Sequence, residues 1–142
     1  MLKPLAFWDS SALIPLCVTQ PQSAESRLLY EGYGIVAWWA TQVEMMSGLA
    51  RLDRTGQITR DRFLMAKQIA LEIVRDWLPV GSTESIALSA CSLLELHPLR
   101  AADALQLAAA LEWCEGEPRG NVFLTFDKRL REAAGLTGFT LE

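Results

Sequence analysis

Residues 5–13 read LAFWDSSAL, an apolar run that leads directly into Asp9 and the hydroxyl side chains of Ser10 and Ser11. Residues 122–127, VFLTFD, have the same design, because another apolar run ends in Asp127. Short apolar runs bounded by polar residues predict buried strands, and Ser10 predicts the N-cap of a following helix. Ligands of open α/β sheets bind beyond the carboxyl ends of the strands. The two acids are therefore candidates for one shared site.

The rest of the chain alternates strand and helix patterns around these two runs. Strands are predicted at residues 5–9, 35–39 and 122–125, with a short edge strand at 78–80 and a final strand at 139–141. Helices are predicted over residues 12–18, 22–31, 41–53, 59–77, 83–96, 101–113 and 128–134. This alternation predicts an α/β fold, a helix-rich three-layer α/β/α sandwich with a short parallel sheet and right-handed crossovers. We expect one domain over residues 2–142.

The composition is typical of a compact protein that stays out of membranes. Of the 142 residues, 51% are hydrophobic and 21% are charged. No stretch approaches the roughly 18 uninterrupted apolar residues of a membrane span. The apolar run at 5–8 is too short for a signal peptide and ends in an acid. These features predict a cytoplasmic protein without a membrane partner.

Four acids, Asp9, Glu44, Asp103 and Asp127, stand where a predicted strand ends or a predicted helix begins. Each has a purely structural alternative: Asp9 and Asp127 could cap helices, and Asp103 could interact with a helix dipole. Glu44, three residues after Thr41, could complete a capping box. All four nevertheless point to the same sheet edge, where mutual repulsion would be strong without a cation. The pattern favours a metal site.

The residue types at this edge indicate which metal would bind. The chain has one histidine, His97, and its three cysteines match no zinc-ligand spacing. Oxygen ligands alone suit Mg²⁺ or Mn²⁺. Such an ion can polarise a phosphodiester and generate a hydroxide nucleophile. The sequence therefore predicts phosphoryl-transfer chemistry.

Four segments together resemble the motifs of PIN-domain ribonucleases, and most closely those of the VapC-type toxins of bacterial toxin–antitoxin pairs. They are DSSAL at 9–13, Glu44 in an early helix, AADA at 101–104 and TFDKRL at 125–130. The resemblance runs from Leu5 to Leu141. It implies Mg²⁺- or Mn²⁺-dependent endonucleolytic cleavage of RNA, inhibition by a small antitoxin protein, and homodimers.

The resemblance also implies roles for individual residues. Asp9 and Asp103 match direct metal ligands, and all four acids are the expected catalytic and metal-binding residues. The other matching positions are acids that complete the site or orient water, Glu44 and Asp127, and supporting hydroxyls, Ser11 and Thr125.

The charge balance bears on the RNA substrate. The net charge of −4 argues against nucleic acid, but without the four candidate acids 13 basic residues face 13 acidic ones. Residues 51–76 carry a mild basic excess, which is either a solvated helical face or a phosphate-binding surface that a dimer could concentrate.

The antitoxin is expected to lie in an apolar groove and to offer a basic side chain to the acids. The bulky apolar residues beside Glu44, namely Trp38, Trp39, Met45 and Met46, are candidates for that groove, with ordinary core packing as the alternative.

Two other classes of function remain open from the sequence. One is another Mg²⁺-dependent phosphoryl-transfer enzyme, such as a phosphatase of the haloacid-dehalogenase type. That class needs a second Asp two residues after the first, where this chain has Ser11. The other class is a non-catalytic interaction module with the same fold, which would have no chemical need for four carboxylates.

Overall fold

The computed structural model describes residues 2–142, and within them a parallel sheet forms the middle layer. Its strands lie in the order β3-β2-β1-β4, and each neighbouring pair is parallel. The strands are β1 (Leu5–Trp8), β2 (Gly34–Trp38), β3 (Leu78–Val80) and β4 (Val122–Leu124). β3 lies at the edge of the sheet, as its proline predicts. The predicted α/β fold is confirmed.

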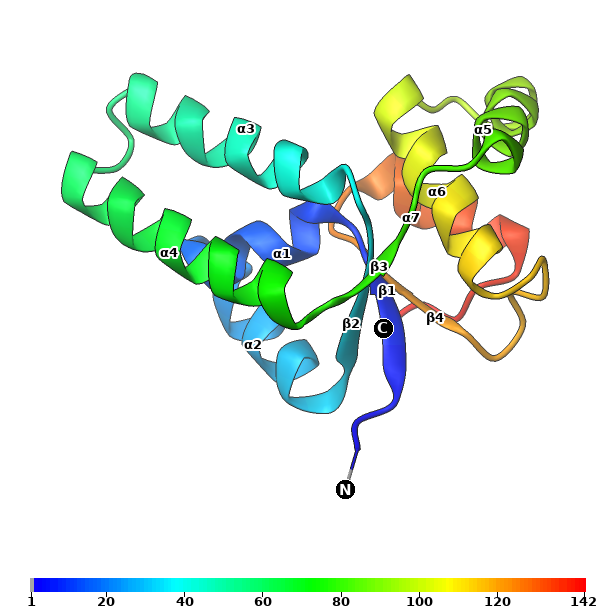
Figure 1. The fold of residues 1–142 in the computed structure, drawn as a ribbon, viewed down its shortest axis with the longest axis horizontal. Coiled ribbons are helices and arrows are strands. Elements are labelled where there is room, and N and C mark those ends of the chain that lie inside the picture. Colours follow the sequence, from blue (N-terminus) through cyan, green and yellow to red (C-terminus); the bar gives the residue numbers. More distant parts are fainter. Residues whose placement is uncertain (1) are drawn as a thin grey trace.

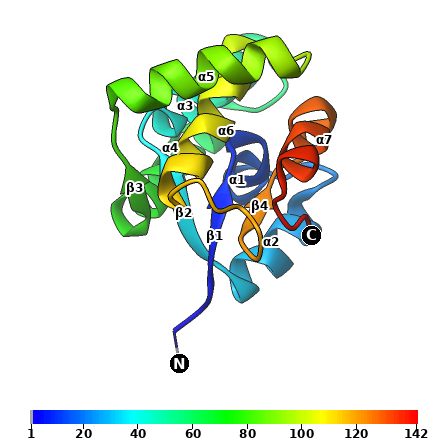
Figure 2. The ribbon, with the colours of Figure 1, turned by 90° about the vertical axis from the view of Figure 1, so that its right-hand side faces the viewer.

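Helices cover both faces of the sheet (Figures 1 and 2). One face carries α1 (Ser10–Cys17), α2 (Ser23–Gly32), α3 (Thr41–Arg54) and α4 (Arg60–Asp76), and the other carries α5 (Glu84–Leu96), α6 (Ala101–Trp113) and α7 (Lys128–Thr137). Among residues 2–142, no helix combines the length and the apolar character needed to cross a membrane.

Alternate residues of the central strands belong to two separate cores. Ala6 and Trp8 pack toward α1, α3 and α4, whereas Phe7 between them packs toward α5, α6 and α7. Ile35 and Val36 of β2 divide in the same way. Strands buried on both faces read as continuous apolar runs, which explains why β1 and β2 lack an alternating pattern.

The structure of the C-terminal segment differs from the one predicted from the sequence. α7 continues to Thr137 and ends at Gly138, whose φ of 122° suits a residue without a side chain. The predicted final strand at 139–141 is wrong, because only an isolated bridge joins Thr140 to Val122. The prediction of Ser10 as a helix N-cap is also wrong, since Asp9 occupies that position.

Two serines of α2 complete the hydrogen bonding of α1, the short helix that Asp9 caps. Ser26 Oγ donates to the carbonyl of Ala12 at 3.0 Å, and Ser23 Oγ donates to the carbonyl of Pro15 at 2.7 Å. Both serine side chains are buried. Because a buried carbonyl without a partner is costly, these bonds hold α1, and with it Asp9, against the sheet.

We expect Ser23→Ala to lower the free energy of unfolding by about 1–3 kcal/mol, because it leaves buried backbone groups without partners. Ser92→Ala is the matched control, since Ser92 Oγ donates to the carbonyl of Leu88 on an exposed face. That control should stay within about 0.5 kcal/mol of wild type. Chemical denaturation measures both; equal effects would contradict the role of Ser23.

Candidate active site at the carboxyl edge of the sheet

Asp9 follows β1 and is almost fully buried, with 3% of its surface exposed. Its Oδ2 accepts hydrogen bonds from Ser11 Oγ at 2.6 Å and from Thr125 Oγ1 at 2.8 Å. Its Oδ1 accepts only a long bond of 3.4 Å from Ser10 Oγ. One carboxylate oxygen is therefore used to hold the side chain in place, and the other keeps its capacity to accept further partners.

The two supporting hydroxyls join the ends of β1 and β4. Ser11 Oγ accepts a bond from the backbone N–H of Phe126 at 2.9 Å, and Thr125 Oγ1 accepts one from that of Asp127 at 3.0 Å. The two hydroxyl oxygens lie 3.1 Å apart. The polar residues after both strands thus form one network around the Asp9 carboxylate.

Glu44, in the first turn of α3, is held by side chains from two other helices. Its Oε1 accepts from Ser10 Oγ at 3.2 Å, and its Oε2 accepts from Gln106 Nε2 at 3.1 Å. The capping-box alternative is wrong, because the N-cap of α3 is Ala40 and Thr41 is already helical. Glu44 is directed toward Asp9 rather than toward its own helix end.

Asp103 and Asp127 complete the acidic side of the same cleft. Asp103 lies half-buried in the first turn of α6. Asp127 caps α7, since its Oδ1 accepts from the Leu130 N–H at 2.8 Å. Together with Glu44 they line a cleft of about 640 Å³, beside Ser10. The cleft opens at the sheet edge that the sequence predicts, and α1, α3, α6 and α7 form its walls.

Burial and mutual repulsion disfavour the charged forms of these acids. Burial is the main cause that raises the pKa of Asp9, of Asp103 and of Glu44, the last to about 6. The charge of Asp9 raises the pKa of both Glu44 and Asp103 further, and that of Asp127 adds to the pKa of Asp103. A cation bound in the cleft would favour the charged carboxylates and so lower these pKa values.

The donor set fits Mg²⁺ or Mn²⁺. Among residues 2–142, no three acidic, histidine or cysteine side chains are close enough together to ligate one ion directly. The acids surround a cleft rather than meet at one point. Mg²⁺ usually keeps several waters and binds through one or two carboxylates plus substrate oxygens, so this arrangement suits it better than a closed cage of protein ligands would.

Exposed basic residues from α3, α7 and the N-cap of α6 also line the cleft: Arg51, Arg100, Lys128 and Arg129. Of the basic excess predicted over residues 51–76, only Arg51 reaches it. Arg100, Lys128 and Arg129 could have been identified from the sequence, because each lies within three residues of Asp103 or Asp127. Positive charge is therefore concentrated where a phosphate would approach the acids, although the whole chain carries −4.

Sequence reasoning missed two residues that bind the acids. Ser10 donates to both Asp9 and Glu44, and Gln106 donates to Glu44. Gln106 could have been identified from the sequence, because a residue three positions after Asp103 lies on the same face of the predicted helix. A hydroxyl next to Asp9 could equally have been a cap, as we predicted for Ser10.

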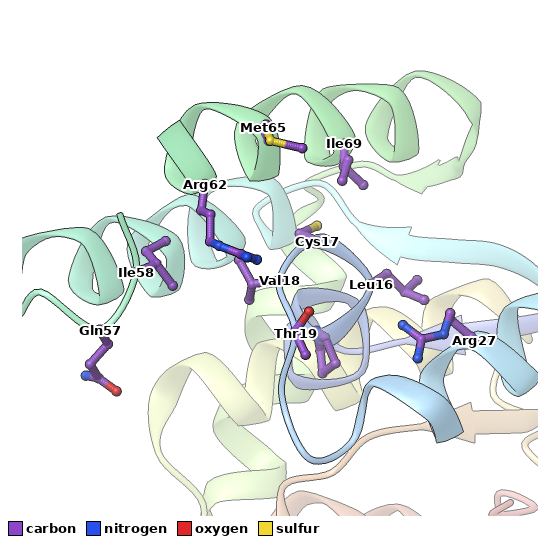
Figure 3. Close-up of a pocket in the computed structure, with 11 residues that line it drawn as sticks. Leu16, Cys17, Val18, Thr19, Arg27, Gln57, Ile58, Arg62, Met65 and Ile69 are labelled. Atoms are coloured by element: carbon purple, nitrogen blue, oxygen red, sulfur yellow. The ribbon is translucent and has the colours of Figure 1, made fainter. Parts of the chain in front are cut away.

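Trp38 and Met45 are buried, with exposures of 5% and 1%, so for these two residues core packing, the alternative, is correct. Trp39 is exposed and Met46 is partly buried, so the groove beside Glu44 stays a prediction for them. A separate hollow of about 620 Å³ lies between α1, α2 and α4 (Figure 3). Arg27 and Arg62 extend toward it from α2 and α4, and apolar side chains such as that of Met65 line it.

Comparisons with known proteins agree with this fold. The PIN domain family matches residues 6–136. Ribonuclease VapC45 of Mycobacterium tuberculosis is 30% identical over 143 residues, which cover 95% of this chain and 92% of that protein. Among solved structures, Mycobacterium tuberculosis VapC20, described as a Sarcin-Ricin loop cleaving toxin, is similar with a TM-score of 0.68 and 16% identity. That match covers 95% of this chain and 96% of VapC20.

A toxin–antitoxin complex from Klebsiella pneumoniae is similar with a TM-score of 0.63 and 17% identity, over 87% of this chain and 88% of that one. At these identities, the two solved structures show a shared fold.

The raised pKa values predict how stability changes with pH in the absence of metal. A carboxyl group whose folded pKa lies above its unfolded value binds protons preferentially in the folded state, so its stabilising effect is lost as pH rises through the folded pKa. For Glu44 this window runs from 4.5 to about 6. Asp103→Asn removes one raised group and one source of repulsion on Glu44.

In chelator, we therefore expect Asp103→Asn to gain stability relative to wild type as pH rises from about 4 to 7. Thermal unfolding at a series of pH values measures this. The exposed first-turn acid of α4 provides the control, Asp61→Asn, which leaves the cleft unchanged. A loss for Asp103→Asn of about 0.3–1 kcal/mol, the same at every pH, would instead indicate a helix-dipole role.

Proposed function

The chain belongs to the PIN-domain family, among the VapC ribonucleases, and we propose that it is an endoribonuclease that hydrolyses RNA phosphodiester bonds as the toxin of a toxin–antitoxin pair. The observation that carries this proposal is the cleft itself, in which the partly buried acids Glu44, Asp103 and Asp127 face basic residues. Such a cleft can bind a phosphate and a cation together.

We propose that Mg²⁺ or Mn²⁺ is held by Asp9 and Asp103, with Glu44 and Asp127 completing the site directly or through water. When bound, the ion would polarise the phosphodiester and lower the pKa of a water nucleophile. Support for Asp9 comes from its Oδ1, which has only one long hydrogen bond. Support for the others comes from their shared position on the cleft wall.

Side chains of the protein would bind the RNA, accept a proton and keep Asp9 in position. The basic residues of the cleft would bind the phosphates on either side of the scissile bond, because guanidinium and ammonium groups pair with phosphate oxygens. Glu44, if it completes the site through water, can accept a proton from the attacking water. The network of Ser11 and Thr125 keeps Asp9 from turning away.

For the antitoxin, we propose that the hollow of Figure 3 receives an apolar segment that also carries acidic side chains. Among residues 2–142, neither Arg27 nor Arg62 forms a salt bridge, so both are available to pair with a partner's carboxylates. Met65 leaves 65% of its surface exposed, which offers apolar area to cover.

A second hollow, of about 490 Å³, borders the active site, and its Gln20 directly follows Thr19 of the hollow in Figure 3 along the chain. It is lined by the turn of residues 20–22 and shares Ile14, Arg51 and Asp127 with the acidic cleft. We propose that the antitoxin's tail follows this route and brings a basic side chain to the acids, which would occupy the place of the metal and the RNA.

We further propose that residues 2–142 act as a single PIN-like domain, that the protein is a homodimer and that it works in the cytoplasm, where its RNA substrate would be found. Light scattering of the purified protein at several concentrations tests the dimer.

RNA cleavage should require Mg²⁺ or Mn²⁺ and stop in excess EDTA. Asp9→Asn and Asp103→Asn should each lower the rate by orders of magnitude, because each removes an anionic contact with the cation. Asparagine retains the ability of Asp9 to cap α1, so folding should persist. A cleavage assay on a defined RNA with wild type and both variants gives the comparison.

Asp61→Asn, on the outer face of α4, serves as the control and should cleave like wild type. Undiminished cleavage in EDTA would disprove the metal mechanism. A folded wild type without any activity on RNA, but with Mg²⁺-dependent release of phosphate from small phosphomonoesters, would favour a phosphatase; no activity on either substrate would favour a non-catalytic module.

Arg62→Glu should weaken the complex with the antitoxin, because it places a negative charge where we expect the partner's acids. Co-purification with the product of an adjacent small open reading frame measures this. Arg75→Glu, also on α4 but outside the hollow, is the charge-matched control. Equal binding by both variants would contradict the proposed docking surface, while the RNA cleavage of each free variant checks that its active site is intact.

A further inference from the structure

Gln106 lies on α6 one turn after Asp103 and is fully buried. Its Nε2 donates two hydrogen bonds, to Thr41 Oγ1 at 2.9 Å and to Glu44 Oε2 at 3.1 Å. Both acceptors belong to α3, which covers the opposite face of the sheet from α6. The amide therefore joins the two helical layers directly behind the acidic cleft.

Packing alone does not account for a glutamine at this position. Among residues 2–142, its Oε1 is the buried side-chain oxygen that has no hydrogen-bond partner. An unpaired buried acceptor costs stability. A methionine or leucine of similar size would fill the same volume among the alanines of α6 without that cost. The presence of a glutamine must therefore be explained by the hydrogen bonds of its amide nitrogen, Nε2.

The amide nitrogen of Gln106 fixes the carboxylate of Glu44. One oxygen of Glu44 accepts from Ser10 and the other from Gln106, so the carboxylate cannot rotate without losing one of them. The direction of the amide follows from the same chemistry, since a reversed amide would set its oxygen against a carboxylate oxygen and both are acceptors. Thr41, itself fully buried, holds the amide from the far side.

From this geometry we infer that Gln106 is a positioning residue for the metal site: it sets the orientation of Glu44 and its separation from Asp103 across the cleft. The inference rests on the proposed metal-dependent function. Residues that bind metal ligands from behind typically change metal affinity by about 10- to 100-fold when they are replaced. Gln106 would act in this way although it never touches the ion or the RNA.

Binding of Mn²⁺ to the RNA-free protein, followed by the EPR signal of free Mn²⁺, tests the inference without relying on activity. We expect Gln106→Met to weaken Mn²⁺ binding by about 10- to 100-fold. Its melting temperature in EDTA should fall only modestly, because loss of the unpaired Oε1 offsets part of the cost of leaving the buried Thr41 hydroxyl without its partner. Leu107→Met, at the next fully buried position of α6, is the control and should bind Mn²⁺ like wild type.

Thr41→Val provides a second variant if Gln106→Met does not fold. It preserves shape but removes one of the two anchors of the amide, so it should weaken Mn²⁺ binding in the same direction. Wild-type affinity in a folded Gln106→Met protein, or in Thr41→Val if only that variant folds, would overturn the positioning role alone. Failure of the wild type itself to bind Mn²⁺ would overturn the metal mechanism, and the role of Gln106 with it.

Discussion

Burial of the Asp9 carboxylate between the ends of β1 and β4 is the constraint on which the site depends. A carboxylate with 3% exposure would be strongly destabilising without donors, and Ser11 and Thr125 supply them. The same two hydroxyls accept backbone N–H groups after β4, so the bonds that satisfy Asp9 also set the path of the chain toward α7. Asp127 reaches the cleft because of this path.

The remaining acids come from helices on opposite faces of the sheet. Glu44 belongs to α3 and Asp103 to α6, and repulsion among the charged carboxylates works to open the cleft between these layers. Ser10 and Gln106, which are uncharged donors, oppose that tendency with hydrogen bonds to the Glu44 carboxylate. The acids are thus held around a space rather than in contact with one another. Such a space accommodates a cation with its waters and a phosphate, which explains why basic residues line the same cleft.

The fold was largely predictable, because its strands and helices have strong and different apolar periods. Errors arose where one residue type serves two purposes. Ser10 is a good cap in isolation, but Asp9 takes the cap and leaves the serine hydroxyl free to bind Glu44. Trp38 and Met45 lie beside an acid in the sequence, yet β2 and α3 direct both side chains into the cores. At 139–141 a single bridge to β4 replaces the expected strand, since α7 extends to Thr137 and leaves few residues after it to pair with the sheet.

By itself, the sequence determined the order of strands and helices, the four acids at strand ends and helix starts, and the absence of a zinc-ligand set. These are local properties, because apolar period, turn residues and ligand types are read within a few positions. Only the tertiary structure decided that Gln106 binds Glu44 across 62 positions of sequence, and that Arg100 and Lys128 line one cleft with Arg51. Such pairings depend on how the two helical layers pack on the sheet, and packing is a property of the whole chain.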